Sequence, residues 1–317
     1  MTNKKEIYKE FCSSRGMTEI FLQPWWLDAV CQGNDWDVSL SYDDQGNVNG
    51  VLPYMVEKKG IFRLLRMPPL TPFLGVWLAV FNGEKLHHKY SHEKKIMSVL
   101  IDGLPDFHYF AQKFSPDITN WYPFFLNGFD QTTSYTYIIH DIKDHERVWN
   151  NMKNTIRTII RKAENMLSIE ETDQIDHHIA LQTETFDRQG MKTPFPGVLP
   201  KAIFSEVKER AQGTLLKAVD DNNNIHATCL LVWDSCNAYN LMLGVNTELR
   251  NSGAVQLLIW EGIKLVSSKV DVFNFEGSML PHIEPVFRHF GGVQTPYFRI
   301  SKDRNKGLRL LRSILGK

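Results

Sequence analysis

The sequence has few of the features that mark secreted, metal-binding or membrane-spanning proteins. It contains four cysteines, and none belongs to a C-x-x-C pair or stands at a metal-ligand spacing from histidine. No stretch approaches the ~18 consecutive apolar residues that a membrane-spanning helix needs. The first dozen residues, MTNKKEIYKEFC, lack the apolar core of a signal peptide. We therefore expect a cytoplasmic, soluble protein with reduced cysteines, no structural metal and no membrane span.

The sequence also lacks an excess of either charge. Its 36 basic residues equal its 36 acidic residues, so no overall field attracts nucleic acid or a membrane. This balance disfavours a large tRNA-binding surface, which needs clustered Lys and Arg. A length of 317 residues with 43% hydrophobic residues is instead typical of one large or two ordinary globular domains.

The predicted elements occur twice in a similar order: helix, hairpin, strand, helix, strand, short helix and strand. In the first half they are predicted at residues 26–31, 38–44 with 48–57, 74–78, 93–102, 107–114, 121–129 and 134–140. In the second half they are predicted at residues 179–189, 215–220 with 225–234, 238–245, 254–266 and 272–277, followed by a short helix that ends at residue 289 and a strand at 295–301. A helix over 144–166 precedes the second set. Two similar domains, 1–140 and 141–317, explain this repeated order.

Four positions carry candidate chemistry, and each also has a structural explanation. The segment of Arg250, Asn251, Ser252, Gly253 and Ala254 opens a predicted helix, where free N–H groups bind anions. The alternative there is an ordinary loop in which Ser252 caps the helix.

The predicted helix over 144–166 carries Lys153, Arg157 and Arg161 at intervals of four residues. Such a row of cations on one face suits a bound diphosphate. The alternative is a solvated basic face partly neutralised by Glu164.

The strand predicted at 272–277 ends in Glu276, followed by Gly277 and Ser278. A carboxylate at a strand tip is suited to accept a proton from an amine, and Ser278 to position a carbonyl or protonate a leaving group. The alternative is that these residues cap the next short helix. Arg188, before a loop rich in Gly and Pro, is a weaker substrate-binding candidate, and His177 and His178 are interpreted as surface residues.

The order strand, hairpin, R-x-x-G-A, helix, strand, helix, strand resembles the GNAT acyltransferase fold. The segment R-x-x-I-R-K-A-E from Arg157 to Glu164 is similar to one in the FemAB/FemX aminoacyltransferases and the broader BioF2-like group. The similarity spans nearly the whole chain and is also strong over 273–278 and 287–297. It implies an α/β (α+β) fold of two tandem GNAT-like domains, each a mixed, mostly antiparallel sheet flanked by helices.

The resemblance also implies roles for residues. Arg157 or Arg161 would contact the diphosphate of a nucleotide- or lipid-linked precursor, and Arg188, Arg288 and Tyr297 would line the substrate site. Residues 250–254 would hold the diphosphate of coenzyme A, and Glu276 and Ser278 would act in catalysis. The sequence departs from the family pattern at Val255, at Met166, where glycine is common, and at Phe287, where a lysine is expected.

Two functions follow. The first is an N-acyltransferase that moves an acyl or aminoacyl group from acyl-CoA or aminoacyl-tRNA onto an amine acceptor, such as a cell-wall (peptidoglycan) or polysaccharide precursor, with no tightly bound cofactor. The second is a catalytically silent protein of the same fold that binds a nucleotide-sugar or lipid-linked ligand.

Overall fold

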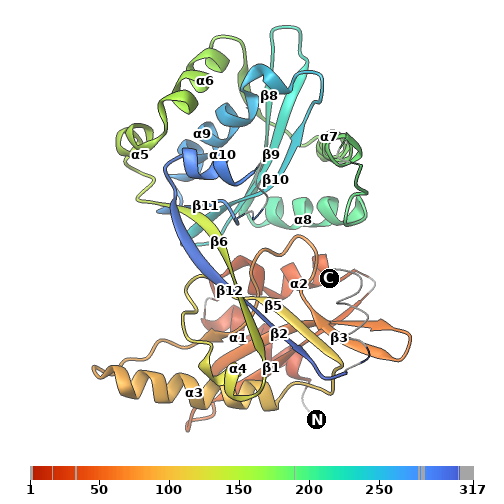
Figure 1. Cartoon of the computed structure of the whole chain (residues 1–317), viewed down its shortest axis with the longest axis vertical. Helices are drawn as coiled ribbons and strands as arrows, with labels where there is room; N and C mark the ends of the chain where they lie inside the picture. The colour runs from red at the N-terminus through yellow and green to blue at the C-terminus, as the bar shows by residue number, and fades with distance from the viewer. Residues whose placement is uncertain are drawn as a thin grey trace. The chain divides into compact units, whose positions relative to one another are not determined.

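The chain forms two compact units, each built from segments that are distant in sequence (Figure 1). The computed structural model describes residues 3–15, 17–32, 34–188, 190–277, 279, 283–305 and 307. The first unit comprises Met1–Met17, Phe21–Ser134 and Pro296–Lys317, and the second comprises Thr18–Ile20 and Tyr135–Thr295. The predicted boundary after residue 140 assigns residues 135–140 to the first domain and residues 296–317 to the second. In the structure, residues 135–140 belong to the second unit and residues 296–317 to the first.

The first unit has a sheet with strand order β1-β2-β3-β5-β12, in which β4 pairs with β2. Its strands are β1 (Asp35–Tyr42), β2 (Val48–Lys59), β3 (Phe62–Arg66), β4 (Trp77–Leu78), β5 (Tyr109–Lys113) and β12 (Val293–Asp303). Its helices are α1 (Lys4–Arg15), α2 (Pro24–Val30), α3 (Leu86–Asp102) and α4 (Tyr122–Leu126). The predicted hairpin is confirmed by the antiparallel pairing of β1 with β2, whereas α1 and β3 were not predicted.

The second unit has a sheet with strand order β6-β11-β10-β9-β8-β7. Its strands are β6 (Asp130–His140), β7 (Ser168–Glu171), β8 (Gly213–Val219), β9 (Ile225–Trp233), β10 (Asn237–Val245) and β11 (Val272–Asn274). Its helices are α5 (His145–Asn151), α6 (Asn154–Glu164), α7 (Ile175–Arg188), α8 (Val198–Glu209), α9 (Ala254–Val266) and α10 (Glu284–His289). All neighbours pair antiparallel except β10 and β11, which are parallel.

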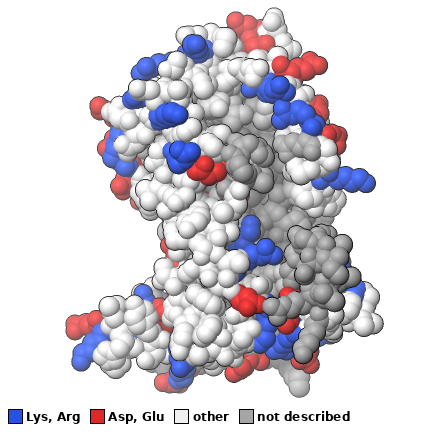
Figure 2. Space-filling model, viewed as in Figure 1, with Lys and Arg blue, Asp and Glu red and all other residues white. Residues whose placement is uncertain are grey.

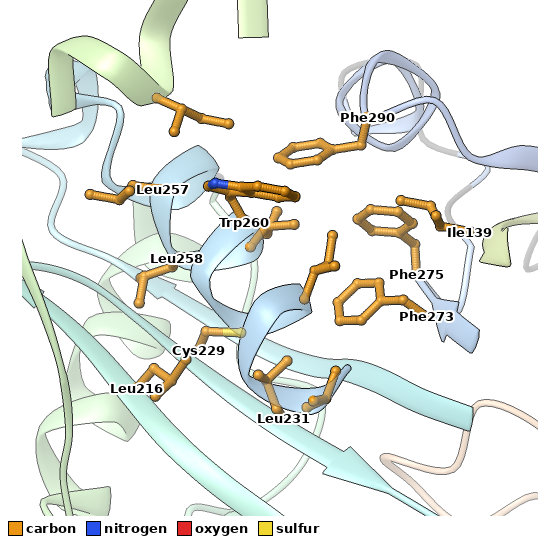
Figure 3. Close-up of a cluster of buried hydrophobic side chains, with 14 of the residues drawn as sticks. Ile139, Leu216, Cys229, Leu231, Leu257, Leu258, Trp260, Phe273, Phe275 and Phe290 are labelled. Carbon is orange, nitrogen blue, oxygen red and sulfur yellow. The ribbon is translucent and has the colours of Figure 1, made fainter. Parts of the chain in front are cut away.

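The middle of this sheet is covered by helices on both faces, as the buried strand β9 requires. Successive side chains of a strand point to opposite faces. Cys229 and Leu231 of β9 join the cluster under α9, where Gly262 lets the helix lie close to Leu231 (Figure 3). Thr228 points the other way and meets α7. The same cluster contains Phe273, Phe275, Phe287 and Phe290, so α10 packs on the face that α9 covers.

The helix predicted over 144–166 is wrong as one element, because the structure divides it into α5 and α6. Met152 has extended backbone angles of φ −66° and ψ 144°. The N–H of Lys153 donates to the carbonyl of His289 at 2.9 Å, so the break is held by a residue of α10. The apolar stripe predicted for this helix, Val148, Met152, Ile156, Ile159 and Ala163, is wrong at one position: Ile159 is 36% exposed, whereas Ile160 is fully buried.

The interpretation of His178 as a surface residue is also wrong. His178 lies on the face of α7 that packs on the sheet and is fully buried. Its Nδ1 lies 2.8 Å from Oγ1 of Thr228, and its Nε2 has no hydrogen-bond partner among the described residues. Burial lowers the pKa of His178 from 6.5 to about 4. Its neighbour His177 is exposed, as expected.

We expect His178 to make the protein less stable in mild acid. The unfolded chain binds a proton near pH 6.5, but the folded chain resists it until about pH 4, so stability falls as pH falls through this window. At pH 5 the loss relative to pH 8 is about 2 kcal/mol. Denaturant unfolding of wild type and His178→Gln at both pH values measures this contribution. The pH dependence from all other titrating groups is the same in both proteins and cancels when the two free energies of unfolding are subtracted. An equal pH dependence in both proteins would contradict the assignment.

Candidate functional site

The second unit contains a point at which two neighbouring strands separate. Parallel pairing joins Asn237–Tyr239 of β10 to Val272–Asn274 of β11, and there β11 ends while β10 continues to Val245. The register of β10 against β9 shifts between Asn240 and Met242, which is a β-bulge. β10 therefore continues for six residues, Asn240 to Val245, beyond its pairing with β11.

Glu276 lies just beyond the end of β11 in a left-handed backbone conformation. Its φ is 61°, a value that is uncommon and costs roughly 1–2 kcal/mol for a residue with a side chain. Gly277 follows with φ 78°, and a Cβ there would lie 2.3 Å from the carbonyl oxygen of Tyr135. Only glycine fits against β6 at this position, so the two residues turn the chain sharply at the strand tip.

The side chain of Asn274 holds this turn. Asn274 is almost fully buried, and its Oδ1 accepts a hydrogen bond from the N–H of Glu276 at 2.8 Å. The same oxygen accepts from Oγ1 of Thr136, on β6, at 2.6 Å. Because both donors would otherwise be buried without a partner, this arrangement stabilises the strained conformation of Glu276.

The carboxyl group of Glu276 points toward the buried centre of the sheet. Its Oε1 is inaccessible to solvent. Burial, and next the negative charge of Glu276, raise the pKa of the Cys229 thiol. That thiol donates to Oδ1 of Asn240 at 3.1 Å. Glu276 is thus hydrogen-bonded to Asn274, which holds Thr136, and its charge acts on Cys229, which is hydrogen-bonded to Asn240.

The structure describes one of the two predicted catalytic residues. Glu276 is at the strand tip, two residues beyond the end of β11. Ser278 lies outside the described residues.

The predicted anion-binding segment is packed against another helix. Arg250–Ser252 form a 3-10 turn, Gly253 has φ 82°, and Ala254 begins α9. A Cβ at Gly253 would lie 2.7 Å from Cγ2 of Ile159 and 3.2 Å from Cβ of Ala163, both on α6. Among the described residues, Oγ of Ser252 is buried without a hydrogen-bond partner, so it does not cap α9 through its side chain. Arg250 and Asn251 are exposed.

Helices α5 and α6 contact both α9 and α10. Trp149 of α5 packs on Trp260 of α9, with ring centroids 5.3 Å apart. Asn151, the last residue of α5, lies against Gly291, two residues beyond the end of α10. The carbonyl oxygen of Asn151 is 2.8 Å from where a Cβ of Gly291 would be. The side chains of Ile159 and Ala163 on α6 thus lie against Gly253, the residue that precedes α9.

The predicted cations on α6 and α7 have separate environments. Arg157 donates to side-chain oxygens of Asn150 and Asn154. Arg161 lies over the ring of Trp149, 5.3 Å from its centroid. Arg188 is the exposed last residue of α7.

Arg288 belongs to a hydrogen-bonded network with β6. Its Nε lies 2.9 Å from Oε1 of Glu284, which also accepts from the hydroxyl of Tyr137. Hydrogen bonds from Arg288 and then Tyr137 lower the pKa of Glu284. Burial and the positive charges of Lys153 and Arg288 lower the pKa of His289. Lys153, the residue before α6, donates its N–H to the carbonyl of His289, the residue next to Arg288.

Tyr297 and Phe287 are core residues. Tyr297, on β12 in the first unit, is 4% exposed and packs edge-on against Phe73 at 5.1 Å. Phe287, at the position where a lysine is expected, is buried and stacks on Phe275 at 4.8 Å. Among the described residues no three metal-ligating side chains lie together.

Four residues of this site were not predicted from the sequence: Asn274, Thr136, Asn240 and Cys229. One signal was available for Asn274, a polar residue between Phe273 and Phe275 in a buried strand. Nothing in the sequence indicated its partner Thr136, because β6 and β11 are far apart along the chain.

No protein-family model and no curated protein matches the sequence, but solved structures do. The chain is similar to FemX, with 13% identity, a TM-score of 0.69 and 98% of each chain covered. A domain from Agrobacterium fabrum, the C-terminal part of a protein assigned as a lysylphosphatidylglycerol synthetase, has 13% identity and a TM-score of 0.58, covering 98% of this chain and 97% of its own. A tandem GNAT protein from the clavulanic acid biosynthesis pathway has 11% identity and a TM-score of 0.52, with 95% of each chain covered. The chain therefore has the FemX-like double-GNAT fold, which confirms the predicted fold class.

We expect Asn274→Ala to destabilise the protein by roughly 2–4 kcal/mol, because it leaves the Glu276 N–H and the Thr136 hydroxyl buried without an acceptor. Thr136→Val removes one donor and should cost about 1 kcal/mol. The double variant should cost less than the sum, since both changes remove the same bond. Urea unfolding measures all three, with Asn237→Ala at the start of β10 as the control. Additive losses would contradict the described network.

Proposed function

We propose that the chain is an acyltransferase that moves an acyl or aminoacyl group onto an amine acceptor at the tip of β11. The observation that carries the proposal is Glu276, held in a strained conformation where β10 and β11 separate. Strained residues held by buried hydrogen bonds are concentrated at functional sites. The FemX-like double-GNAT fold supports the same reaction class.

In the proposed reaction, an amine of the acceptor attacks the carbonyl carbon of an ester or thioester. The carboxylate of Glu276 accepts the proton that the amine loses, the C–N bond forms, and the C–O or C–S bond to the donor breaks. The leaving oxygen or sulfur takes up the proton. Asn274 and Thr136 act as positioning residues, because they fix the backbone from which Glu276 extends.

Acyl-CoA and aminoacyl-tRNA are the two donor classes in this proposal. Ile159 and Ala163 occupy the space next to Gly253, so a diphosphate cannot lie against this residue at the start of α9 without moving them. This packing favours a donor that is recognised elsewhere, such as the aminoacyl ester of a tRNA, although the neutral net charge of the chain gives no general attraction to RNA.

The proposed acceptor carries phosphate. Lys153, Arg157 and Arg288 supply cations near the α6–α10 contact, and the FemAB/FemX resemblance points to a nucleotide- or lipid-linked cell-wall precursor. Arg161, stacked on Trp149, is less free to turn toward such a ligand.

The second candidate is a catalytically silent binding protein of the same fold. The observation that favours it is Phe287, which is buried in the core where a Fem transferase is expected to have lysine. Such a protein would keep the phosphate-binding cations and lose turnover.

We expect Glu276→Gln to lower kcat by about 10²-fold or more with little loss of stability, because the amide cannot accept the amine's proton. Turnover is measured with acyl-CoA and aminoacyl-tRNA donors and with UDP-linked muropeptide as acceptor. Asp271→Asn, an exposed carboxylate shortly before β11, is the matched control and should be unchanged. Equal turnover in Glu276→Gln and wild type would remove Glu276 from the mechanism.

Ligand-dependent thermal shift distinguishes the two candidate functions. We expect UDP-linked muropeptide to raise the melting temperature of the wild type, since a ligand that binds only the folded state stabilises it. The shift should fall in Arg288→Ala. A shift with an acceptor but with no acyl donor, together with no turnover, would favour the silent binding protein.

A further inference from the structure

The short helix α4 presents large apolar side chains to solvent. Pro123 and Phe124 point into the core of the first unit. Tyr122, Phe125 and Leu126, at positions i, i+3 and i+4, share the opposite face. They are 55%, 56% and 49% exposed. Three neighbouring side chains of this kind are unusual on a surface that only contacts water.

Helix α3 extends this apolar surface. Tyr90 is 55% exposed and lines, together with Tyr122 and Lys94, a shallow hollow of about 460 Å³. In the view of Figure 2 the surface over α3 and α4 is mostly uncharged, with separate charged side chains around it. We name Tyr90, Tyr122, Phe125 and Leu126 the aromatic patch.

Basic groups adjoin the aromatic patch on two sides. Lys94 lies at the hollow beside Tyr90 and Tyr122. Past the C-terminal end of α4, Nζ of Lys302 donates to the carbonyl of Asn127 and lies 4.9 Å from the centroid of the Phe129 ring. The carboxylate of Glu93 accepts from Asn120 and is 14% exposed, so it offers little charge to an approaching surface.

We propose that the aromatic patch docks onto a lipid bilayer that contains anionic phospholipid. Tyrosine rings place an apolar body at the acyl boundary and a hydroxyl among the headgroups, while Phe125 and Leu126 enter more deeply. Lysines bury their stems and reach the phosphates with their ammonium groups. The cations around the aromatic patch complement an anionic surface. This inference uses the first unit only and is independent of the proposed reaction.

The test is co-sedimentation of the full chain with vesicles of phosphatidylcholine, with and without phosphatidylglycerol. Wild type should bind the anionic vesicles more strongly, and added salt should weaken binding. Phe125→Ser and Lys94→Glu should each lower the partition coefficient by about tenfold or more. Ile61→Ser, an 85% exposed apolar residue between β2 and β3, and Lys58→Glu, an exposed lysine of β2, are the matched controls and should bind as wild type.

The variants are first checked for unchanged thermal unfolding, and Tyr122→Ser replaces any that fails. Failure of wild type to bind anionic vesicles would overturn the proposal. Equal losses in the patch variants and the controls would do the same. A wild-type dimer in light scattering that dissociates in Phe125→Ser, without vesicle binding, would show that a second copy covers the aromatic patch instead.

Discussion

One side-chain carbonyl supports the geometry of the candidate site. Oδ1 of Asn274 accepts from the hydroxyl of Thr136 and from the N–H of Glu276. The first bond ties β11 to β6, and the second keeps Glu276 in a conformation that it would otherwise leave. Because the chain turns here, β11 ends while β10 continues, and Oε1 of Glu276 is buried rather than exposed to solvent.

The helices before β7 pack along α9. Ile159 and Ala163 of α6 lie against Gly253, and Trp149 of α5 packs on Trp260 in the middle of α9. The same layer carries Lys153 and Arg157 toward solvent near α10. The segment from α5 to α6 thus packs against the residue before α9 and also bears exposed cations.

Local patterns predicted the elements that depend on local chemistry. The apolar period from Ala254 to Val266 predicted α9 with its observed bounds, and the Asp221–Asn224 turn predicted the β8–β9 hairpin. Two of the wrong predictions involve partners distant in sequence. Met152 continues an apolar stripe, yet the backbone breaks beside it because Lys153 bonds to His289. His178 was predicted to be exposed because it is polar, but it is buried against the sheet and hydrogen-bonded to Thr228 of β9.

The order of strands along the chain has a consequence for synthesis. The first unit needs β12, since residues 299–303 pair with β5, and these residues follow the whole second unit in sequence. A ribosome therefore releases the last strand of the first unit only after it has made the whole second unit. Until then β5 has an open edge on that side, and open edges invite pairing with other chains. The first unit, most of which precedes the second unit in sequence, can therefore complete its sheet only after the second unit has been made.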